Sequence, residues 1–294
     1  MILTIIRCAC PINDDDVPIV LIHGFIADQT VFNQLIENIK RDFPNRKVYA
    51  PKILFGYFSS IFCGFTRYVR VTATAISKIS NDAECIDLVG HSQGGLVSRA
   101  YIQLYSGTKK YPTVRNFISL AGAQGGFYCG SNCPDFLQNG VVRFAQKHMY
   151  SNFFQARATP AGYWRDPYQF NTYAEQCGVL ALINGECPNQ HFAVGKSKIL
   201  SLNKFYVMYS QIDEVLLPSS SGNFGTYEPW SGKVIELDQN TLYLEDRIGI
   251  RELKTAKKLI QCRTDVWHQD FVENGEYYEN YLKRVLNGDV FECE

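Results

Sequence analysis

Short apolar runs alternate with amphipathic stretches along the first part of this 294-residue chain, from Pro18 to about residue 122. The first run, "PIVLIHG", is continuously apolar and ends in glycine, which is typical of a strand covered on both faces of a parallel sheet. Amphipathic stretches between such strands serve as helical crossovers. The alternation therefore predicts an α/β fold with a mostly parallel sheet and helices on both faces.

The individual elements follow from the same periodicities. In "ADQTVFNQLIENIKRDFP" a helix is expected, with Asp28 as its N-cap and Pro44 beyond its end. A helix is also expected in "TRYVRVTATAISKIS", although its β-branched residues disfavour one. The other predicted helices are "GGLVSRAYIQLYS", "RELKTAKKLIQC" and "EYYENYLKRVL", and the other predicted strands are "RKVYAPKI", "ECIDLVGHS", "VRNFISLAG", "KFYVMYS" and "KVIELD".

The alternation stops between Ala123 and Gly195, where the chain is rich in Gly, Asn, Tyr, Phe and Cys and has little periodicity. A segment of this length inside an α/β domain is typically a lid or a substrate-binding insertion. We therefore expect a single domain over residues 1–294 with an inserted cap at residues 123–200.

Charge and hydropathy exclude two classes of function. Lys plus Arg equals Asp plus Glu at 29 each, so the chain offers no basic field for nucleic acid. Apolar runs such as "PIVLIHGF" fall well short of the roughly 20 residues that a membrane helix needs, so no transmembrane segment is predicted.

The ten cysteines indicate an oxidising compartment, lysosomal or secreted. Two pairs lie close in sequence, Cys129 with Cys133 and Cys177 with Cys187. Buried thiols are one alternative, because cysteine packs like a small apolar residue. Zinc is another, but no C-x-x-C pair occurs and no metal is predicted. The lack of an Asn-x-Ser/Thr sequon and of a recognisable signal peptide argues against secretory passage.

The segment "LVGHSQGGLVSRAY" sets Ser92 between glycines where a predicted strand meets a predicted helix. Gly90 to Gly94 matches G-x-S-x-G, and the strand-to-helix context is the one this motif requires. Such an elbow strains the serine backbone on a turn so sharp that flanking Cβ atoms would collide. Ser92 is therefore the predicted nucleophile. A turn that binds nothing is the alternative, and a phosphate loop is excluded because no G-x-x-x-x-G-K-[ST] segment occurs.

A serine nucleophile needs a histidine base, and in this context the chain order is serine, acid, histidine. Only His268, in "RTDVWHQDF", follows every predicted late strand, so it is the predicted base. A surface-loop histidine is the alternative. The remaining histidines either precede Ser92 or lie in the irregular region: His23, His91, His148 and His191.

The acid should follow a late strand at the same sheet edge, where it would fix the imidazole tautomer. Asp213, in "KFYVMYSQIDEVLLP", occupies such a turn. Its neighbour Glu214 is the immediate rival, and Asp238 and Asp246 are later ones. Asp246 is expected to form a solvated pair with the adjacent Arg247.

Two backbone amides are predicted to hold the oxyanion. The N–H of Gln93 lies at the start of the helix after the nucleophile, and the N–H of Phe25 lies in the loop "HGF" after the first strand. Gly24 would let the backbone approach, and His23 is expected to brace that loop. A plain turn is the alternative for this loop.

With these residues placed, the chain resembles the palmitoyl-protein thioesterases, and more closely the second branch of that family. The similarity spans about Pro18 to Phe271. The stretches "YWRDP" and "ALINGE" are more specific than the elbow, and the others that carry it are "GHSQGGLVSRA", "FISLAG", "FGTY", "LYLEDRIGI" and the closing "WH".

The resemblance implies an α/β-hydrolase that cleaves fatty-acyl thioesters, on S-acylated protein or acyl-CoA, without a cofactor, in the lysosome. At the positions that match the family, the resemblance implies a catalytic triad of Ser92, Asp213 and His268. It also implies that the backbone amides of Phe25 and Gln93 are the oxyanion donors. It also implies an acyl-binding role for residues 123–200 and a pairing of the cysteines in "QCGVLALINGEC". A carboxylic-ester lipase or esterase on the same fold and a catalytically dead acyl-binding module are the rival interpretations.

Overall fold

A parallel sheet forms the centre of the protein. The computed structural model describes residues 10–11, 14–80, 83–131, 133 and 144–289. In these residues the main sheet has six strands in the order β2-β1-β3-β4-β5-β8, and every neighbouring pair is parallel. The strands are Ile19–Ile22 (β1), Val48–Tyr49 (β2), Cys85–His91 (β3), Thr113–Leu120 (β4), Lys204–Tyr209 (β5) and Leu259–Arg263 (β8).

The strand β3 shows how the sheet is covered. Successive side chains of a strand point to opposite faces, and all seven residues of β3 are buried. Both faces are therefore packed, as the continuous apolar run in the sequence predicts. The parallel α/β architecture is confirmed.

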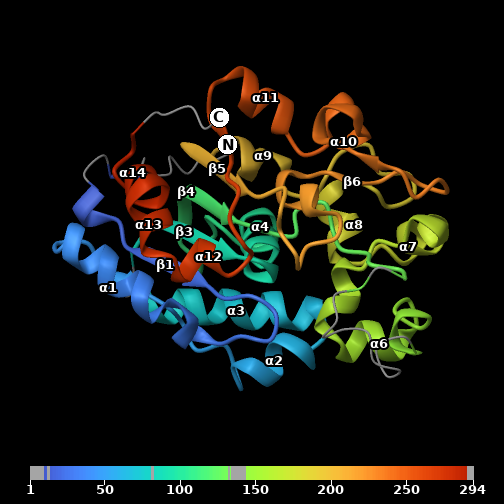
Figure 1. Ribbon diagram of the computed structural model, residues 1–294, viewed down its shortest axis with the longest axis horizontal. Helices are drawn as coiled ribbons and strands as arrows, with labels where there is room; N and C mark the ends of the chain where they lie inside the picture. The colour runs from blue at the N-terminus through green and yellow to red at the C-terminus, as the bar shows by residue number, and fades with distance from the viewer. Residues whose placement is uncertain (1–9, 12–13, 81–82, 132, 134–143, 290–294) are drawn as a thin grey trace, which may run out of the picture.

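Helices connect and surround these strands (Figure 1). The helix α4 packs on β1, β3 and β4 and is itself packed against α3, while α1 lies beside the C-terminal helices. The helices of the described residues are Asn33–Asp42 (α1), Tyr57–Ile61 (α2), Phe65–Ile79 (α3), Gln93–Leu104 (α4), Asn152–Arg157 (α6), Phe170–Gln176 (α7), Val179–Asn184 (α8), Lys196–Leu200 (α9), Thr241–Leu244 (α10), Ile250–Thr255 (α11), Asp270–Glu273 (α12), Gly275–Tyr277 (α13) and Lys283–Leu286 (α14).

The first two long helices follow their sequence signals. Asp28 is an N-cap, but of a short 3₁₀ turn at Gln29–Phe32 that leads into α1, and its carboxylate accepts the N–H of Thr30 at 2.9 Å. The helix α3 forms despite its β-branched content because its buried residues recur every three or four positions, so burial of one face outweighs weak propensity.

Three of the predicted helices and strands were wrong in part. The stretch "RELKTAKKLIQC" is not one helix: α11 ends before Lys257, whose positive φ of 54° turns the chain into β8. The strand in "KVIELD" forms as β7 (Val234–Ile235), but it pairs antiparallel with β6 (Thr226–Tyr227) in a separate sheet. The expected strand in "RKVYAPKI" shortens to the two residues of β2.

The connection from β4 to β5 contains α6 to α9, and a buried ion pair holds it together. Arg165 of "YWRDP" lies 2.8 Å from Glu186 of "ALINGE". Tyr173 and Asn184 donate to the second oxygen of Glu186 at 2.7 and 3.0 Å, and Arg165 also donates to Thr226 at 2.6 Å. The two most specific stretches of the sequence are therefore the two halves of one buried polar cluster.

Disulfides join the pairs that the sequence places close together, Cys129–Cys133 and Cys177–Cys187, and this prediction is confirmed. A third joins Cys10 to Cys85 at the start of β3, and Cys262 is disulfide-bonded as well. Among the described cysteines, Cys63 is a free buried thiol, whose pKa burial raises. Among the described helices, none is long and apolar enough to span a membrane.

Candidate active site

Ser92 lies directly between β3 and α4, at the carboxyl edge of the sheet. Its backbone has φ 56° and ψ −129°, a conformation that costs free energy for a residue with a side chain. Its N–H donates to the carbonyl of Leu120 at the end of β4, and its carbonyl accepts the N–H of Gly95, both at 2.9 Å. The turn is thus fixed by the neighbouring strand and by the first turn of α4.

The glycines around Ser92 are required by close backbone contacts. A methyl group at Gly90 would lie 2.5 Å from the carbonyl oxygen of Gly94, and one at Gly94 would collide with the carbonyl oxygen of Ile22. A methyl group at Gly24 would lie 3.2 Å from the Oγ of Ser92. The elbow therefore packs against the loop after β1, and that loop runs beside the serine side chain.

Asp213 and His268 form a buried pair. Asp213 follows β5, and one of its carboxylate oxygens accepts the N–H groups of Val215 and Leu216 at 2.9 and 2.8 Å. The other oxygen lies 2.7 Å from the Nδ1 of His268, and both side chains are buried. The turn thus orients the carboxylate, and the carboxylate orients the imidazole.

A contact between two histidines brings this pair to the elbow. The Nε2 of His91, the residue before Ser92, lies 3.0 Å from the carbonyl oxygen of His268, and the two ring centroids are 4.9 Å apart. Since β4 and β5 lie between β3 and β8 in the sheet, the loop after β8 must return across the sheet edge to make this contact. Burial, with the neighbouring charge of His268, lowers the pKa of His91 to about 3.

Gln93 follows Ser92 directly, and Phe25 follows Gly24, whose backbone lies close to the Ser92 side chain. Gln93 is the first residue of α4, whose first N–H groups have no partner within the helix. Neither the amide of Phe25 nor that of Gln93 donates to the described part of the chain. His23 lies in the same loop, with its Nδ1 3.1 Å from the carbonyl oxygen of Gly24, and burial lowers its pKa.

Ser60 and Tyr163, which lie far apart in the sequence, hold the residue after Phe25 and the side chain of Gln93 in place. The Oγ of Ser60, in α2, accepts the N–H of Ile26 at 3.0 Å, and Ile26 has the positive φ of 54° that β-branched residues avoid. The side chain of Gln93 donates to the Ser60 carbonyl at 3.3 Å and accepts the hydroxyl of Tyr163 at 2.9 Å. Residues 123–200 therefore touch the elbow through Tyr163.

The sequence interpretation missed several of these supporting residues. His91 stands inside the elbow motif and was available as a signal. Glu214, considered as a rival acid, instead accepts the backbone N–H of His268 at 3.0 Å. Of the two later rivals, Asp238 is exposed and Asp246 is buried. The expected solvated pair of Asp246 with Arg247 was wrong, because Asp246 pairs with Lys196 at 3.1 Å and Arg247 pairs with Glu245.

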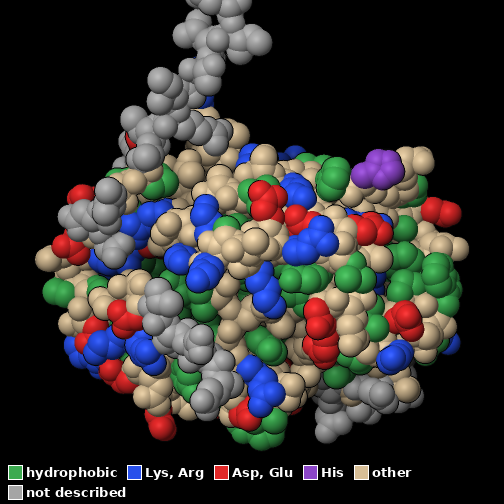
Figure 2. Space-filling model, turned by 90° about the horizontal axis from the view of Figure 1, so that it is seen from above, with side chains coloured by type: hydrophobic (Ala, Val, Ile, Leu, Met, Phe, Trp, Pro, Cys, Tyr) green, Lys and Arg blue, Asp and Glu red, His purple; other side chains and the backbone are tan. Residues whose placement is uncertain are grey.

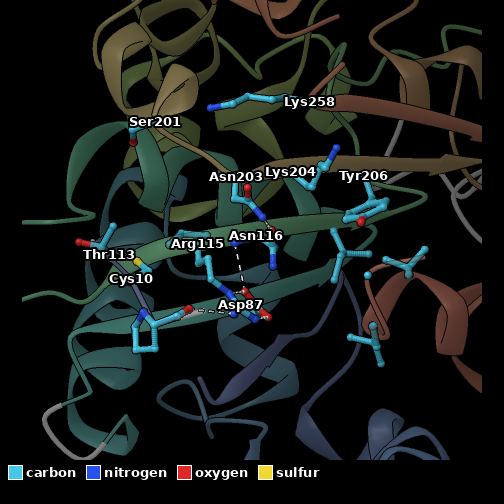
Figure 3. Close-up of a pocket in the computed structure, with 16 residues that line it drawn as sticks. Cys10, Asp87, Thr113, Arg115, Asn116, Ser201, Asn203, Lys204, Tyr206 and Lys258 are labelled. Atoms are coloured by element: carbon cyan, nitrogen blue, oxygen red, sulfur yellow. Dashed lines mark hydrogen bonds and ion pairs between the residues drawn. The ribbon is translucent and has the colours of Figure 1, made fainter. Parts of the chain in front are cut away.

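A cavity of about 590 Å³ lies at the opposite edge of the sheet (Figure 3). Its lining includes Asp87 near the start of β3, Thr113 at the start of β4 and Lys204 at the start of β5. Arg115 donates to both oxygens of Asp87 in the cavity wall, while Lys204 and Lys258 donate to backbone carbonyls. Because β3 spans about 20 Å, this cavity is separate from the site around Ser92.

A parallel sheet carrying a serine elbow, with a carboxylate and an imidazole converging on the same edge, defines the α/β-hydrolase class. Solved structures agree on the fold. Carboxyl esterase 2 from Tuber melanosporum matches with a TM-score of 0.51 at 12% identity, covering 95% of this chain and 78% of that one. Aspergillus fumigatus lipase B matches with a TM-score of 0.50 at 14% identity, covering 92% and 54%.

The chain belongs to the palmitoyl protein thioesterase family, whose model matches residues 18–268. It is 31% identical over 254 residues to palmitoyl-protein thioesterase 3 of Dictyostelium discoideum, covering 86% of this chain and 85% of that protein. It is 25% identical over 292 residues to lysosomal thioesterase PPT2-B of Xenopus laevis, covering 97% and 98%. The family indicated by the sequence motifs is confirmed, and with it the class of a thioester hydrolase.

Proposed function

We propose that the chain hydrolyses fatty-acyl thioesters through an acyl-enzyme formed on Ser92. The observation that carries this proposal is the 2.7 Å contact between Asp213 and the Nδ1 of His268, beside the strained elbow that presents Ser92. Family membership supplies the substrate class. S-acylated protein and acyl-CoA are both within that class.

In the proposed mechanism the hydroxyl of Ser92 attacks the thioester carbonyl while the Nε2 of His268 accepts its proton. The amides of Phe25 and Gln93 hold the developing oxyanion. The thiolate leaves with the proton from His268, and water activated by the same imidazole then releases the fatty acid and frees Ser92. Asp213 keeps the Nδ1 of His268 protonated and stabilises the imidazolium.

We assign residues 123–200 as the cap that covers this site and binds the acyl chain. The contact of Tyr163 with Gln93 supports the assignment, as does the buried Arg165 and Glu186 pair, which gives the segment a polar framework of its own. The disulfides and the lysosomal relatives favour a lysosomal location over a merely secreted one.

The first experiment is labelling with a fluorophosphonate. We expect stoichiometric labelling of the native chain, none of Ser92→Ala, and undiminished labelling of Ser98→Ala. Ser98 is a matched control because it lies in α4 as well, is fully buried and makes no hydrogen bond through its hydroxyl in the described residues. Labelling that persists in Ser92→Ala would overturn the nucleophile, and no labelling of the native chain would favour a binding module.

The second experiment compares palmitoyl thioester with palmitoyl oxyester. A thioesterase should turn over the thioester faster, because the thiolate is the better leaving group. Equal kcat/KM on the two substrates would indicate a general esterase rather than a thioesterase. The assignment of Ser92 as the nucleophile would be unaffected.

A further inference from the structure

The segment around α2 exposes large apolar side chains to solvent. Phe55, Phe58 and Phe62 are 80%, 65% and 70% exposed. Phe58 lies in α2, Phe55 lies in the turn before it and Phe62 is its C-cap, so the three exposed rings come from one short segment. Exposed apolar residues gathered in this way mark an interaction site. We use the name α2 surface for the group of exposed side chains formed by Leu54, Phe55, Tyr57, Phe58 and Phe62.

The helix α6 extends this surface. The N–H of Cys63 donates to the hydroxyl of Thr159 at 3.2 Å, and that hydroxyl donates to the carbonyl of Ser59 at 3.0 Å, so α2 is packed against the segment that follows α6. Figure 1 shows α2 and α6 along the same lower edge of the molecule. Phe153 of α6 is 59% exposed, and the guanidinium of Arg157 lies 4.6 Å above its ring.

The charged residues in the segments that form the α2 surface and α6 are basic. The chain as a whole balances 29 basic against 29 acidic residues, but no Asp or Glu occurs in residues 43–81 or 144–165. Lys52, Arg67, Arg70, Lys147 and Arg157 in these two segments are exposed. Asp28 lies beside Gly56 at the start of α2, and its carboxylate accepts two hydrogen bonds from Thr30.

The opposite side of the molecule differs. Seen from above, the face over α9 to α11 shows acidic and basic side chains interspersed, with apolar groups scattered among them (Figure 2).

The α2 surface lies next to the candidate active site. Ser60, on the other side of the same helix, bonds both Ile26 and Gln93, which flank Ser92. The exposed rings thus stand one helix away from the proposed oxyanion donors.

We propose that the α2 surface docks this protein on lipid bilayers that carry anionic headgroups. The aromatic rings enter the boundary between headgroups and acyl chains, and the surrounding Lys and Arg side chains contact the anionic headgroups. Docking in this orientation brings the side of the molecule next to the proposed oxyanion donors to the membrane, where the acyl chains of acylated substrates reside. That last step rests on the proposed thioesterase activity, whereas the docking itself does not.

The test measures partition of Ser92→Ala protein, which turns over no acyl group, onto vesicles by co-sedimentation. Vesicles of phosphatidylcholine mixed with phosphatidylglycerol should bind it more strongly than vesicles of phosphatidylcholine alone, and added salt should reduce the difference. Phe58→Ser and Phe62→Ser should each lower the partition coefficient about tenfold. Arg67→Gln and Arg70→Gln should each lower it about fivefold, on the anionic vesicles only.

Two control variants make the same changes far from α2. Phe192→Ser removes a ring that is 58% exposed just before α9, and Lys254→Gln removes an exposed charge in α11. Neither should change the partition. The proposal is overturned if no vesicle binds, if the controls lower binding as much as the α2 variants, or if sedimentation without lipid shows a dimer that Phe58→Ser dissociates.

An activity measurement separates docking from catalysis. In the otherwise native enzyme, Phe58→Ser should raise the apparent KM for a palmitoyl thioester presented in anionic vesicles and leave hydrolysis of a short-chain soluble thioester unchanged. Equal losses on both substrates would show that the ring serves the active site rather than the membrane. A native enzyme that binds vesicles but hydrolyses neither substrate would refute the proposed function alone.

Discussion

The carboxylate of Asp213 lies 2.7 Å from the Nδ1 of His268, across 55 residues of intervening sequence. Its other oxygen is held by the backbone amides of Val215 and Leu216, so the orientation is fixed from both sides. In Asp213→Asn the amide NH2 can donate to Nδ1, which favours the wrong tautomer of His268, and no negative charge remains to stabilise the imidazolium. We expect kcat for thioester hydrolysis to fall about 10⁴-fold with the fold intact.

The matched control for that variant is Glu214→Gln, which removes a neighbouring carboxylate. Glu214 is exposed and accepts the backbone N–H of His268 at 3.0 Å. Weakening one such hydrogen bond should cost at most about tenfold in kcat. A loss as large as that of Asp213→Asn would assign the acid to Glu214 instead.

The candidate triad could be predicted from chain order because each of its members follows a strand. Parallel strands end at one edge, so residues after β3, β5 and β8 are brought to that edge by the sheet itself. The supporting contacts have no such rule. His91 contacts the carbonyl of His268 in the loop after β8, and Ser60 bonds Ile26 in the loop after β1. Both contacts depend on how these loops pack, and neither loop has a periodic sequence pattern.

The boundary between α11 and β8 shows where sequence patterns fail within the sheet. The turn there is made by Lys257 in a left-handed conformation, where glycine would have been a recognisable signal. A helical period therefore extends through "KTAKKLIQC", and the strand becomes identifiable only through its pairing with β5. The five-residue α2 was missed for a related reason, since a single helical turn has no period to detect.

A second prediction concerns the space around the elbow. In Gly94→Ala the new methyl group would collide with the carbonyl oxygen of Ile22 and lie 2.6 Å from that of His23, and both are backbone atoms of the β1 end. We expect the free energy of unfolding to fall by about 1–3 kcal/mol, measured by urea denaturation. Gly275→Ala is the control, because no atom lies within 4 Å of its added methyl group. Equal stability of the two variants would contradict the packing described for the elbow.

A third prediction follows from the low pKa of His91. Burial lowers it to about 3, below the 6.5 of an unfolded chain, so the folded state binds its proton less readily. The contribution of His91 to stability is therefore complete above about pH 6.5 and is lost as the pH falls from there towards about 3, by up to about 1.4 kcal/mol per pH unit. We expect His91→Gln to have the shallower dependence of unfolding free energy on pH.

The control variant for this pH dependence of the unfolding free energy is His148→Gln, which removes an exposed histidine. Its pH dependence should match that of the native chain. His23, whose pKa burial also lowers, remains in both variants, so some acid sensitivity should persist in His91→Gln. Parallel pH profiles for the native chain and His91→Gln would show that His91 is not buried as a neutral ring.

The last prediction compares a buried with an exposed ion pair. Burial alone would raise the pKa of Glu186, but the charge of Arg165 and the hydrogen bonds to Glu186 hold it below its ordinary value. Glu186→Gln would leave the buried guanidinium of Arg165 without its countercharge, and we expect about 3–5 kcal/mol of destabilisation in urea denaturation. In the solvent-exposed pair of Arg247 with Glu245, Glu245→Gln should cost at most about 1 kcal/mol. Equal costs for Glu186→Gln and Glu245→Gln would contradict the stabilising role of the buried pair of Arg165 with Glu186.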